Sequence, residues 1–323
     1  MTDIPAVSFI IPVKPGGDVA ALAALLHVDA SCCPFEILVA EGRHPSRQRN
    51  AAVNESRGEI LYFLDDDSLV NPDCLAICAG AMEDPAVAVA GGPSLTPPGD
   101  SLLQQLFGSA LASLFGAGAV RNRYRAVGAV RETTEKELIL CNLAIRKESF
   151  LSLGGFNERL YPNEENELLD RIMASGRTLV HIPQMSVQRS QRKSLNQFIR
   201  QMFSYGRGRA QQSLISESFS FFSFIPLYFV VYLLLASMLA SHVIMLVPLY
   251  VYLALTVFFT AVECVRSGTI TTVLLLLIYP LMHVVNGAGL LVGLLGGKPA
   301  LADDSGVVVR RIKALDQDFE VQS

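Results

Sequence analysis

The chain has 323 residues, of which 51% are hydrophobic, with a net charge of −4 and a mean hydropathy of +0.38. This acidic balance argues against nucleic acid as a partner, because nucleic-acid-binding domains are basic. The six cysteines form neither a disulfide framework nor a zinc-site spacing, which suits a reducing compartment. Length and hydropathy together predict one globular domain of about 215 residues followed by a membrane region.

Three mostly apolar runs near the N-terminus are predicted to be strands, at residues 7–14, 36–42 and 58–64. The segments between them are long enough to hold helices, so the alternation predicts a parallel α/β sheet. In such sheets ligands bind at the carboxyl ends of the strands. Lys14, Glu41 and the triplet Asp65-Asp66-Asp67 all fall at that edge.

The Asp65-Asp66-Asp67 triplet directly follows the third strand. Adjacent carboxylates repel one another, so such a triplet is costly unless it is solvated or holds a hard metal ion through its oxygens. The simpler interpretation is a solvated acidic turn that caps the next helix. The strand context favours a divalent cation that also contacts a diphosphate.

Seven short motifs follow one another along the first two thirds of the chain: Ile10-Ile11-Pro12-Val13, Arg49-Asn50-Ala51-Ala52, Phe63–Asp67, Gly91-Gly92-Pro93, Asn142–Arg146, Gly154–Arg159 and Tyr205–Ala210. Each motif is weak alone, but the order is specific. With these motifs the chain resembles the inverting family 2 glycosyltransferases. The resemblance implies the GT-A fold, a Rossmann-like α/β domain with a mixed sheet that binds a nucleotide diphosphate sugar.

The resemblance also implies roles for individual residues. The nucleotide-sugar pocket would be lined by Pro12, Val13, Glu41, Arg49, Asp65 and Asp66. Asp67, together with Asp65, would hold Mn²⁺ or Mg²⁺. A metal and a cation at this place stabilise the charge that develops on the leaving diphosphate. For Arg49, and for Arg47 as its alternative, the simpler interpretation is a helix-surface arginine in solvent.

The acceptor hydroxyl needs a general base, which the family usually supplies as the second acid of a Glu-Asp pair after the Gly-Gly-Phe segment. Here that pair reads Glu164-Glu165. We predict Glu165 as the base and keep Glu164 as the alternative, since the longer side chain moves the carboxylate outward by one methylene. The simpler interpretation is that these acids stabilise the first turn of a helix over residues 165–174.

Six basic residues and no acidic ones lie between Arg189 and Arg209, immediately before the most hydrophobic part of the chain. Basic residues beside a membrane segment are attracted to anionic headgroups and fix its orientation. Two interpretations stay open. The charges set topology only, or Arg189, Arg192 and Arg207 also hold the phosphates of a lipid-linked acceptor.

Charged residues are absent from 218–262 and again from 267–297. Because a spanning helix needs about 20 apolar residues, the first stretch predicts two spans, 219–240 and 242–262, with a turn at Ser241-His242. The second predicts one span over 269–295 or a re-entrant or interfacial segment. The basic residues Arg310, Arg311 and Lys313 favour the latter under the positive-inside rule.

Large apolar residues recur at helical spacing over residues 102–115. This segment is too short and too polar to cross a membrane. We expect an amphipathic helix that lies in the membrane interface. The alternative is an ordinary helix that faces the core of the catalytic domain.

We therefore expect a cytosolic GT-A domain at 1–215, in which 1–100 bind the nucleotide sugar and 101–215 carry the acceptor part and interfacial helices. A transmembrane region of two or three spans would occupy 216–297, and 298–323 would be a polar tail. The protein would be a multi-pass protein of the cell (inner) membrane with its catalytic domain in the cytoplasm.

The expected activity is the inverting transfer of a single sugar from a nucleotide diphosphate sugar to a lipid-linked saccharide or lipid acceptor, in cell-surface polysaccharide or glycolipid synthesis. One alternative is transfer to a polyprenyl phosphate, which needs no general base because the phosphate is already ionised. A processive polymer synthase is disfavoured, because such enzymes carry a Gln-x-x-Arg-Trp segment and this chain has no Trp. A third alternative is a non-catalytic membrane subunit that binds nucleotide sugar.

Overall fold

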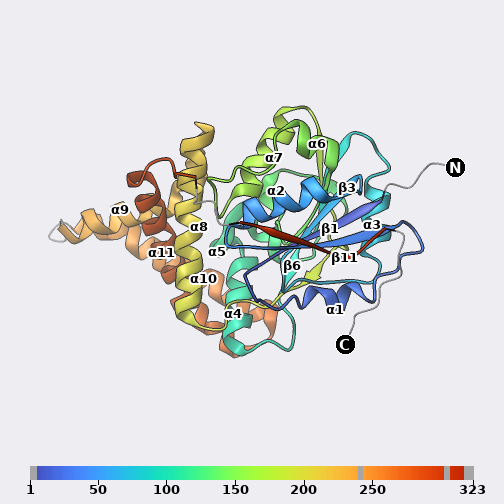
Figure 1. Cartoon of the computed structure of the whole chain (residues 1–323). Coiled ribbons are helices and arrows are strands. Elements are labelled where there is room, and N and C mark those ends of the chain that lie inside the picture. Colours follow the sequence, from blue (N-terminus) through green and yellow to red (C-terminus); the bar gives the residue numbers. More distant parts are fainter. Residues whose placement is uncertain (1–5, 239–242, 302–305, 316–323) are drawn as a thin grey trace. The chain divides into compact units, whose positions relative to one another are not determined.

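The computed structural model describes residues 6–238, 243–301 and 306–315. The chain divides into two compact units. The sheet unit comprises 1–97, 122–190 and 300–323, and the helical unit comprises 98–121 and 191–299. In Figure 1 the strand labels belong to the sheet unit. The helical unit includes the labelled helices α8 (Leu195–Ser216), α9 (Ile225–Met238), α10 (Val247–Ser267) and α11 (Leu275–Leu295). The division differs from the expected boundary at residue 215, because α8 and the 98–121 segment pack with the apolar helices.

The sheet unit is built on an eight-stranded mixed sheet in the order β11-β2-β1-β3-β8-β5-β9-β7. Its strands are β1 (Val7–Val13), β2 (Phe35–Glu41), β3 (Ile60–Leu64), β5 (Val87–Gly91), β7 (Arg131–Glu132), β8 (Asn142–Arg146), β9 (Thr178–His181) and β11 (Val308–Lys313). A second sheet of three short strands has the order β4 (Leu69–Val70), β10 (Val187–Gln188) and β6 (Ser94–Leu95). β1 pairs in parallel with both β2 and β3, which confirms the parallel arrangement predicted for the three N-terminal strands.

The two faces of the large sheet bury separate hydrophobic clusters. Successive residues of a strand point to opposite faces, so Phe9 joins one cluster and Ile10 the other. The first cluster includes residues of α1 (Ala21–Leu25) and α3 (Cys74–Ala81). The second includes residues of α2 (Pro45–Glu55), α6 (Lys147–Ser152) and α7 (Glu164–Ala174). Burial on both faces explains why the strands read as continuous apolar runs rather than as alternating patterns.

β11 stands where the sequence predicted a polar tail. It pairs antiparallel with β2, from Val308 opposite Glu41 to Lys313 opposite Ile37. Lys313 Nζ donates a hydrogen bond to the Phe35 carbonyl at 2.8 Å. The strand is short and carries three basic residues among its valines and isoleucine, so its pattern alone is weak. Pairing with an exposed edge of β2 is what makes it a strand.

The helical unit contains α4 (Leu102–Ala112), α5 (Leu114–Ala117), α8 (Leu195–Ser216), α9 (Ile225–Met238), α10 (Val247–Ser267) and α11 (Leu275–Leu295). Single 3₁₀ segments precede three of these helices: η3 (Phe221–Phe224), η4 (Val243–Leu246) and η5 (Ile270–Leu274). Three helical stretches are long and apolar enough to cross a membrane: Phe221–Met238, Val243–Ser267 and Ile270–Leu295. The turn expected at Ser241-His242 lies outside the described residues.

The helix predicted over 102–115 is present as α4 and α5. The Phe107 ring of α4 stacks on Phe198 of α8 with centroids 4.0 Å apart. Phe115 of α5 contacts the rings of Phe259 in α10 and Tyr279 in α11. The segment therefore packs among the helices of the helical unit, and a 67° bend separates α4 from the helical stretch that follows it.

Candidate active site at the carboxyl edge of the sheet

Asp65 follows β3 directly, and its carboxylate lies between two guanidinium groups. Arg49 Nη2 donates to Asp65 Oδ1 at 2.9 Å, and Arg189 Nη2 lies 3.1 Å from Oδ2. The Arg49 side chain is only 4% exposed, whereas that of Asp65 is 24% exposed. Charge-assisted bonds of this length fix the carboxylate in one orientation at the strand end.

Arg189 also binds the last member of the triplet. Its Nε donates to Asp67 Oδ1 at 2.6 Å. The backbone explains this contact, because Arg189 follows β10, which pairs with β4 just after the triplet. We expected Arg189 to face an acceptor phosphate, and the structure places its guanidinium on the acidic triplet. Asp66 is half-buried, and burial followed by the charges of Asp67 and Asp65 raises its pKa.

Arg49 connects the triplet to α7. It lies on α2, and its Nη1 donates to Glu164 Oε1 at 3.0 Å while its Nη2 binds Asp65. The Glu164 side chain is 2% exposed. Removing either partner from such a buried pair leaves an uncompensated charge, so the link is a fixed part of the site. Arg47 lies on the same helix and pairs with Glu158 at 2.9 Å.

Glu164 and Glu165 occupy the first turn of α7 in different surroundings. Burial raises the pKa of Glu164 to about 8, although the Arg49 guanidinium opposes that shift. Glu165 has weaker partners, with Arg123 Nη1 at 3.6 Å and Asn166 Nδ2 at 3.4 Å. Its side chain is 11% exposed. The Arg49 guanidinium thus holds Glu164 at 3.0 Å, whereas the partners of Glu165 lie farther from its carboxylate.

Arg123 is a neighbour of the site that the sequence did not reveal. Its Nη2 donates to Asn166 Oδ1 and to the Glu135 carbonyl, each at 2.5 Å. The side chain is buried and approaches Glu165 from a segment 42 residues earlier in the chain. Because no local pattern connects the two positions, only the folded chain shows that Arg123 orients the first turn of α7.

Pro12, Val13 and Glu41 lie at the ends of β1 and β2. Val13 pairs in register with Glu41, and Pro12 is buried. The Val13 carbonyl accepts a hydrogen bond from Gln48 Nε2 at 2.8 Å. Glu41 Oε2 lies 2.7 Å from Arg310 Nη2, so β11 brings a cation to the carboxylate that we predicted to bind the nucleotide. These ends and the triplet share the carboxyl edge of the parallel strands.

Within residues 6–238, 243–301 and 306–315, no three His, Cys, Asp or Glu side chains gather closely enough to hold a metal ion. A Mg²⁺ ion, however, is usually bound by one or two carboxylates and completed by substrate phosphates and water. Asp67 fits that requirement, because its side chain is 45% exposed and only its Oδ1 accepts from Arg189. The donor set therefore suits a hard divalent ion shared between protein and diphosphate.

Residues 60–285 match the family model described as Glycosyl transferase family group 2. The match covers more than half of the chain. The chain belongs to glycosyl transferase family group 2. This assignment confirms the family to which the motif order pointed.

Two comparisons place this family member among known proteins. The succinoglycan biosynthesis protein ExoA of Rhizobium meliloti (strain 1021) is 29% identical over 178 residues, which are 53% of this chain and 52% of ExoA. The chain thus spans about half the length of the curated relative it matches.

The mannosyltransferase PcManGT from Pyrobaculum calidifontis, solved with GDP-Man and Mn²⁺, is similar in structure with a TM-score of 0.56 at 16% identity. The match covers 91% of this chain and 88% of that chain. This likeness shows a GT-A type fold. S. aureus TarS 1-349 in complex with UDP-GlcNAc is similar with a TM-score of 0.45, at 14% identity over 64% of this chain and 66% of that chain.

The other arginines that we assigned to an acceptor phosphate belong to the helical unit. Arg192 is exposed before α8, and Arg207 is half-buried on α8.

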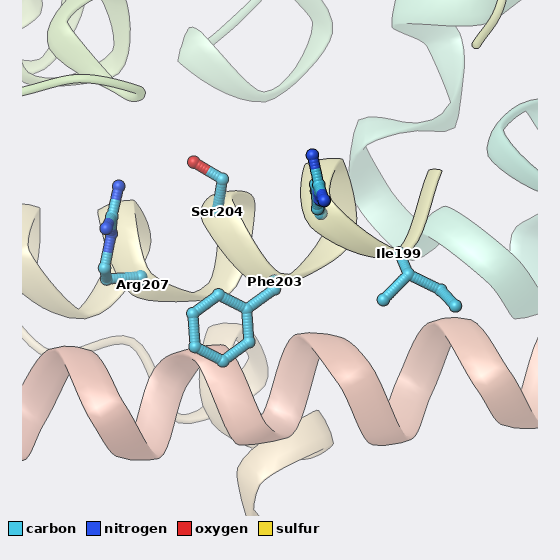
Figure 2. Close-up of a pocket in the computed structure, with 5 residues that line it drawn as sticks. Ile199, Phe203, Ser204 and Arg207 are labelled. Atoms are coloured by element: carbon cyan, nitrogen blue, oxygen red, sulfur yellow. The ribbon is translucent and has the colours of Figure 1, made fainter. Parts of the chain in front are cut away.

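A groove of about 360 Å³ on α8 is lined by Ile199, Arg200, Phe203, Ser204 and Arg207. In Figure 2 Phe203 points toward the neighbouring helix, while Ser204 and Arg207 point away from it. Arg207 Nε is buried without a hydrogen-bond partner among the described residues. The lining of the groove is mostly apolar, and Arg200 and Arg207 add two cationic groups of the kind that bind phosphate.

Proposed function

We propose that this family 2 protein is a membrane-anchored inverting glycosyltransferase that moves a single sugar from a nucleotide diphosphate sugar to a lipid-linked saccharide or other lipid acceptor. The observation that carries the proposal is the continuous ion-pair chain from Asp67 through Arg189, Asp65 and Arg49 to Glu164. It connects the strand end where a diphosphate would bind to the helix turn that carries the candidate base.

On the donor side, Asp65 and Asp67 would hold Mn²⁺ or Mg²⁺. When bound, the ion offsets the negative charge of the leaving nucleoside diphosphate. Glu41, Pro12 and Val13 would line the nucleotide. The neighbour PcManGT was solved with GDP-Man and Mn²⁺, which supports this class of donor and metal for the same fold.

On the acceptor side, Glu165 would act as general base. The acceptor oxygen forms a bond to the anomeric carbon while the bond from that carbon to the diphosphate oxygen breaks. The hydroxyl proton passes to the Glu165 carboxylate, and the nucleoside diphosphate leaves as an anion. Arg123 would be a positioning residue, since it binds Asn166 and the Glu135 carbonyl and approaches Glu165 from one side.

The place of action would be the cytoplasmic face of the cell (inner) membrane. Three helices of the described chain are apolar and long enough to cross it. ExoA is named for succinoglycan biosynthesis, and we extend to this chain the broader role of synthesis of a cell-surface polysaccharide or glycolipid.

A second candidate is transfer to a polyprenyl phosphate. The α8 groove favours it, because Arg200 and Arg207 lie two helical turns apart with Ser204 between them. A phosphate acceptor attacks without losing a proton, so its reaction does not require Glu165. The same groove would serve a lipid-linked saccharide, whose diphosphate carries the same chemistry.

The test is incorporation of labelled sugar into organic-extractable lipid. Purified protein in detergent would receive each of several UDP- and GDP-sugars with Mn²⁺ and a native lipid extract. We expect one donor to label the lipid fraction, with mass spectrometry identifying a single added sugar. Tight donor binding with no labelled product from any lipid extract would contradict the proposal and favour a non-catalytic subunit.

A further inference from the structure

We infer that the chain crosses the membrane twice, through a hairpin of α9 and α10, and that α11 begins and ends on the side where the catalytic sheet lies. Three helices have the length and hydropathy to cross. Of these three, only α9 and α10 would cross the membrane. This assignment rests on the membrane anchoring included in the proposed function, but not on the transferase activity.

The first observation is the position of β11. The chain leaves the sheet unit after Ser190 and returns to it at Ala300. Val308–Lys313 then pairs with β2, at an edge of the sheet. A strand pairs with β2 only on the side of the membrane where β2 lies. The intervening segment must therefore cross an even number of times, so three crossings are excluded.

The second observation is an ion pair between the two ends of the apolar region. Lys298 Nζ lies 3.2 Å from Glu217 Oε1. Glu217 follows α8 and precedes the first apolar stretch, whereas Lys298 follows α11. A third crossing would carry Lys298 across a hydrocarbon layer of about 30 Å from Glu217. Their contact places the entry to the hairpin and the end of α11 at the same level.

The third observation is the packing of α11 on α8. A Cβ added at Gly206 would lie 2.1 Å from the Asn286 carbonyl oxygen, and one at Gly289 would lie 2.1 Å from the Phe203 carbonyl oxygen. Further along, a Cβ at Gly293 would lie 2.6 Å from the Arg207 carbonyl oxygen. The two helices thus run side by side in the same direction with their backbones in close approach.

This packing constrains the orientation of α11. α8 carries Arg200, Arg207 and Arg209 as well as several glutamines and an asparagine, which makes it far too polar to cross a bilayer. The C-terminal half of α11 shares the direction of α8 and is held to it by backbone contact. It therefore lies along the membrane surface with α8.

α9 and α10 have the opposite character. Tyr232 Oη of α9 donates to the Met245 carbonyl at 2.7 Å, and the Phe229 ring stacks on Tyr252 of α10 at 4.3 Å. The two helices therefore form an antiparallel hairpin. Within the spanning windows, 17% of the first stretch and 11% of the second are buried in protein, against 39% of the α11 stretch. The hairpin offers its apolar side chains to lipid, as a crossing pair must.

The test uses single cysteines in the full chain. Cys32 and Cys264 are half-buried and would be replaced by serine, while the four remaining cysteines are buried and react poorly. One cysteine is then introduced at a time at exposed positions: Glu83→Cys on the sheet unit, Val243→Cys before α10, Ser267→Cys after α10 and Lys298→Cys after α11. Each variant is treated with a membrane-impermeant maleimide in right-side-out and in inside-out vesicles, and labelling in SDS above that of the parent without an introduced cysteine shows that the added thiol is present.

We expect the cysteines at 83, 267 and 298 to label from one face and the cysteine at 243 to label only from the other. Labelling at 298 from the same face as 243 would establish a third crossing and overturn the inference. Labelling of all four positions from one face would overturn it as well, since the hairpin would then not cross. If the 298 thiol is silent in both vesicle types, Ala300→Cys, two residues later and exposed, decides between the same two outcomes.

Discussion

The arginines at the carboxyl edge of the sheet differ from those on α8 in what they bind. Arg49 and Arg189 are largely buried, and each of them pairs with two carboxylates. Arg200 and Arg207 line a groove and form no ion pair among the described residues. Arg49 and Arg189 therefore position carboxylates of the protein, whereas Arg200 and Arg207 have no carboxylate partner among the described residues.

The largest loss of activity should come from substitution of Glu165, the proposed general base. Glu165→Gln removes the proposed base and leaves the ion-pair chain intact, so turnover with a hydroxyl acceptor should fall by about 10²- to 10⁴-fold. Steady-state kinetics with the labelled donor would measure it. A rate within a few-fold of wild type would remove Glu165 from the reaction and favour a phosphate acceptor.

Glu167→Gln is the matched control for that variant. Glu167 lies in the same helix turn and pairs with Arg171 at 2.7 Å rather than facing Arg123. Both substitutions remove one negative charge from the helix N-terminus. If the role of Glu165 were only to stabilise that terminus, the two variants would lose activity equally.

The pairing of Arg49 can be broken directly. Arg49→Met leaves Asp65 and Glu164 without their shared cation, and removing one partner of a buried pair costs about 3–5 kcal/mol. A thiol-reactive dye would follow thermal unfolding, because the buried cysteines of the sheet unit become reactive when it opens. Arg177→Met is the control, since its pair with Glu148 is exposed and 3.9 Å long. It should change stability by less than about 0.5 kcal/mol.

The site at the carboxyl edge of the sheet could be predicted from the sequence only in part. The strands β1 to β3 and the triplet could be predicted, because buried runs and adjacent carboxylates are local patterns. The bridge from Asp65 to Glu164 could not, because Arg49 joins residues that are about 100 positions apart. The pairs of Arg189 with Asp65 and Asp67 could not be predicted for the same reason, since only the pairing of β10 with β4 brings Arg189 to the triplet. β11 was missed because its partner strand is some 270 residues earlier.

Glu164 should make the free energy of unfolding depend on pH. Burial raises its pKa from 4.5 to about 8, so the folded protein binds this proton more tightly than the unfolded chain does. The stability that it contributes is fully present below about pH 4.5 and is lost as the pH rises toward 8. Between pH 6 and 8 the free energy of unfolding should fall by at most about 1.4 kcal/mol per pH unit. The slope should flatten in Glu164→Gln, and an identical slope in both proteins would show that Glu164 is ionised throughout.

The smallest effects should come from α8. Each arginine near an anionic surface contributes about 1 kcal/mol, so Arg200→Gln and Arg207→Gln should each raise the apparent KM for the lipid acceptor about fivefold. The KM for the donor should not change. Arg209→Gln is the control on the same helix, because Arg209 donates to Gln212 at 3.0 Å and does not line the groove. Equal effects of all three substitutions would indicate general attraction to the membrane rather than a phosphate-binding site.

The central claim is that the acidic triplet is the donor site, and nucleoside diphosphate release tests it most directly. Wild type, Asp67→Asn and the exposed control Asp73→Asn would be assayed with the labelled donor, lipid extract and Mn²⁺, and again after chelation. We expect release to require the metal, to persist in Asp73→Asn and to fall about 10²- to 10³-fold in Asp67→Asn. Release that is unchanged in Asp67→Asn, or that continues undiminished after chelation, would contradict it.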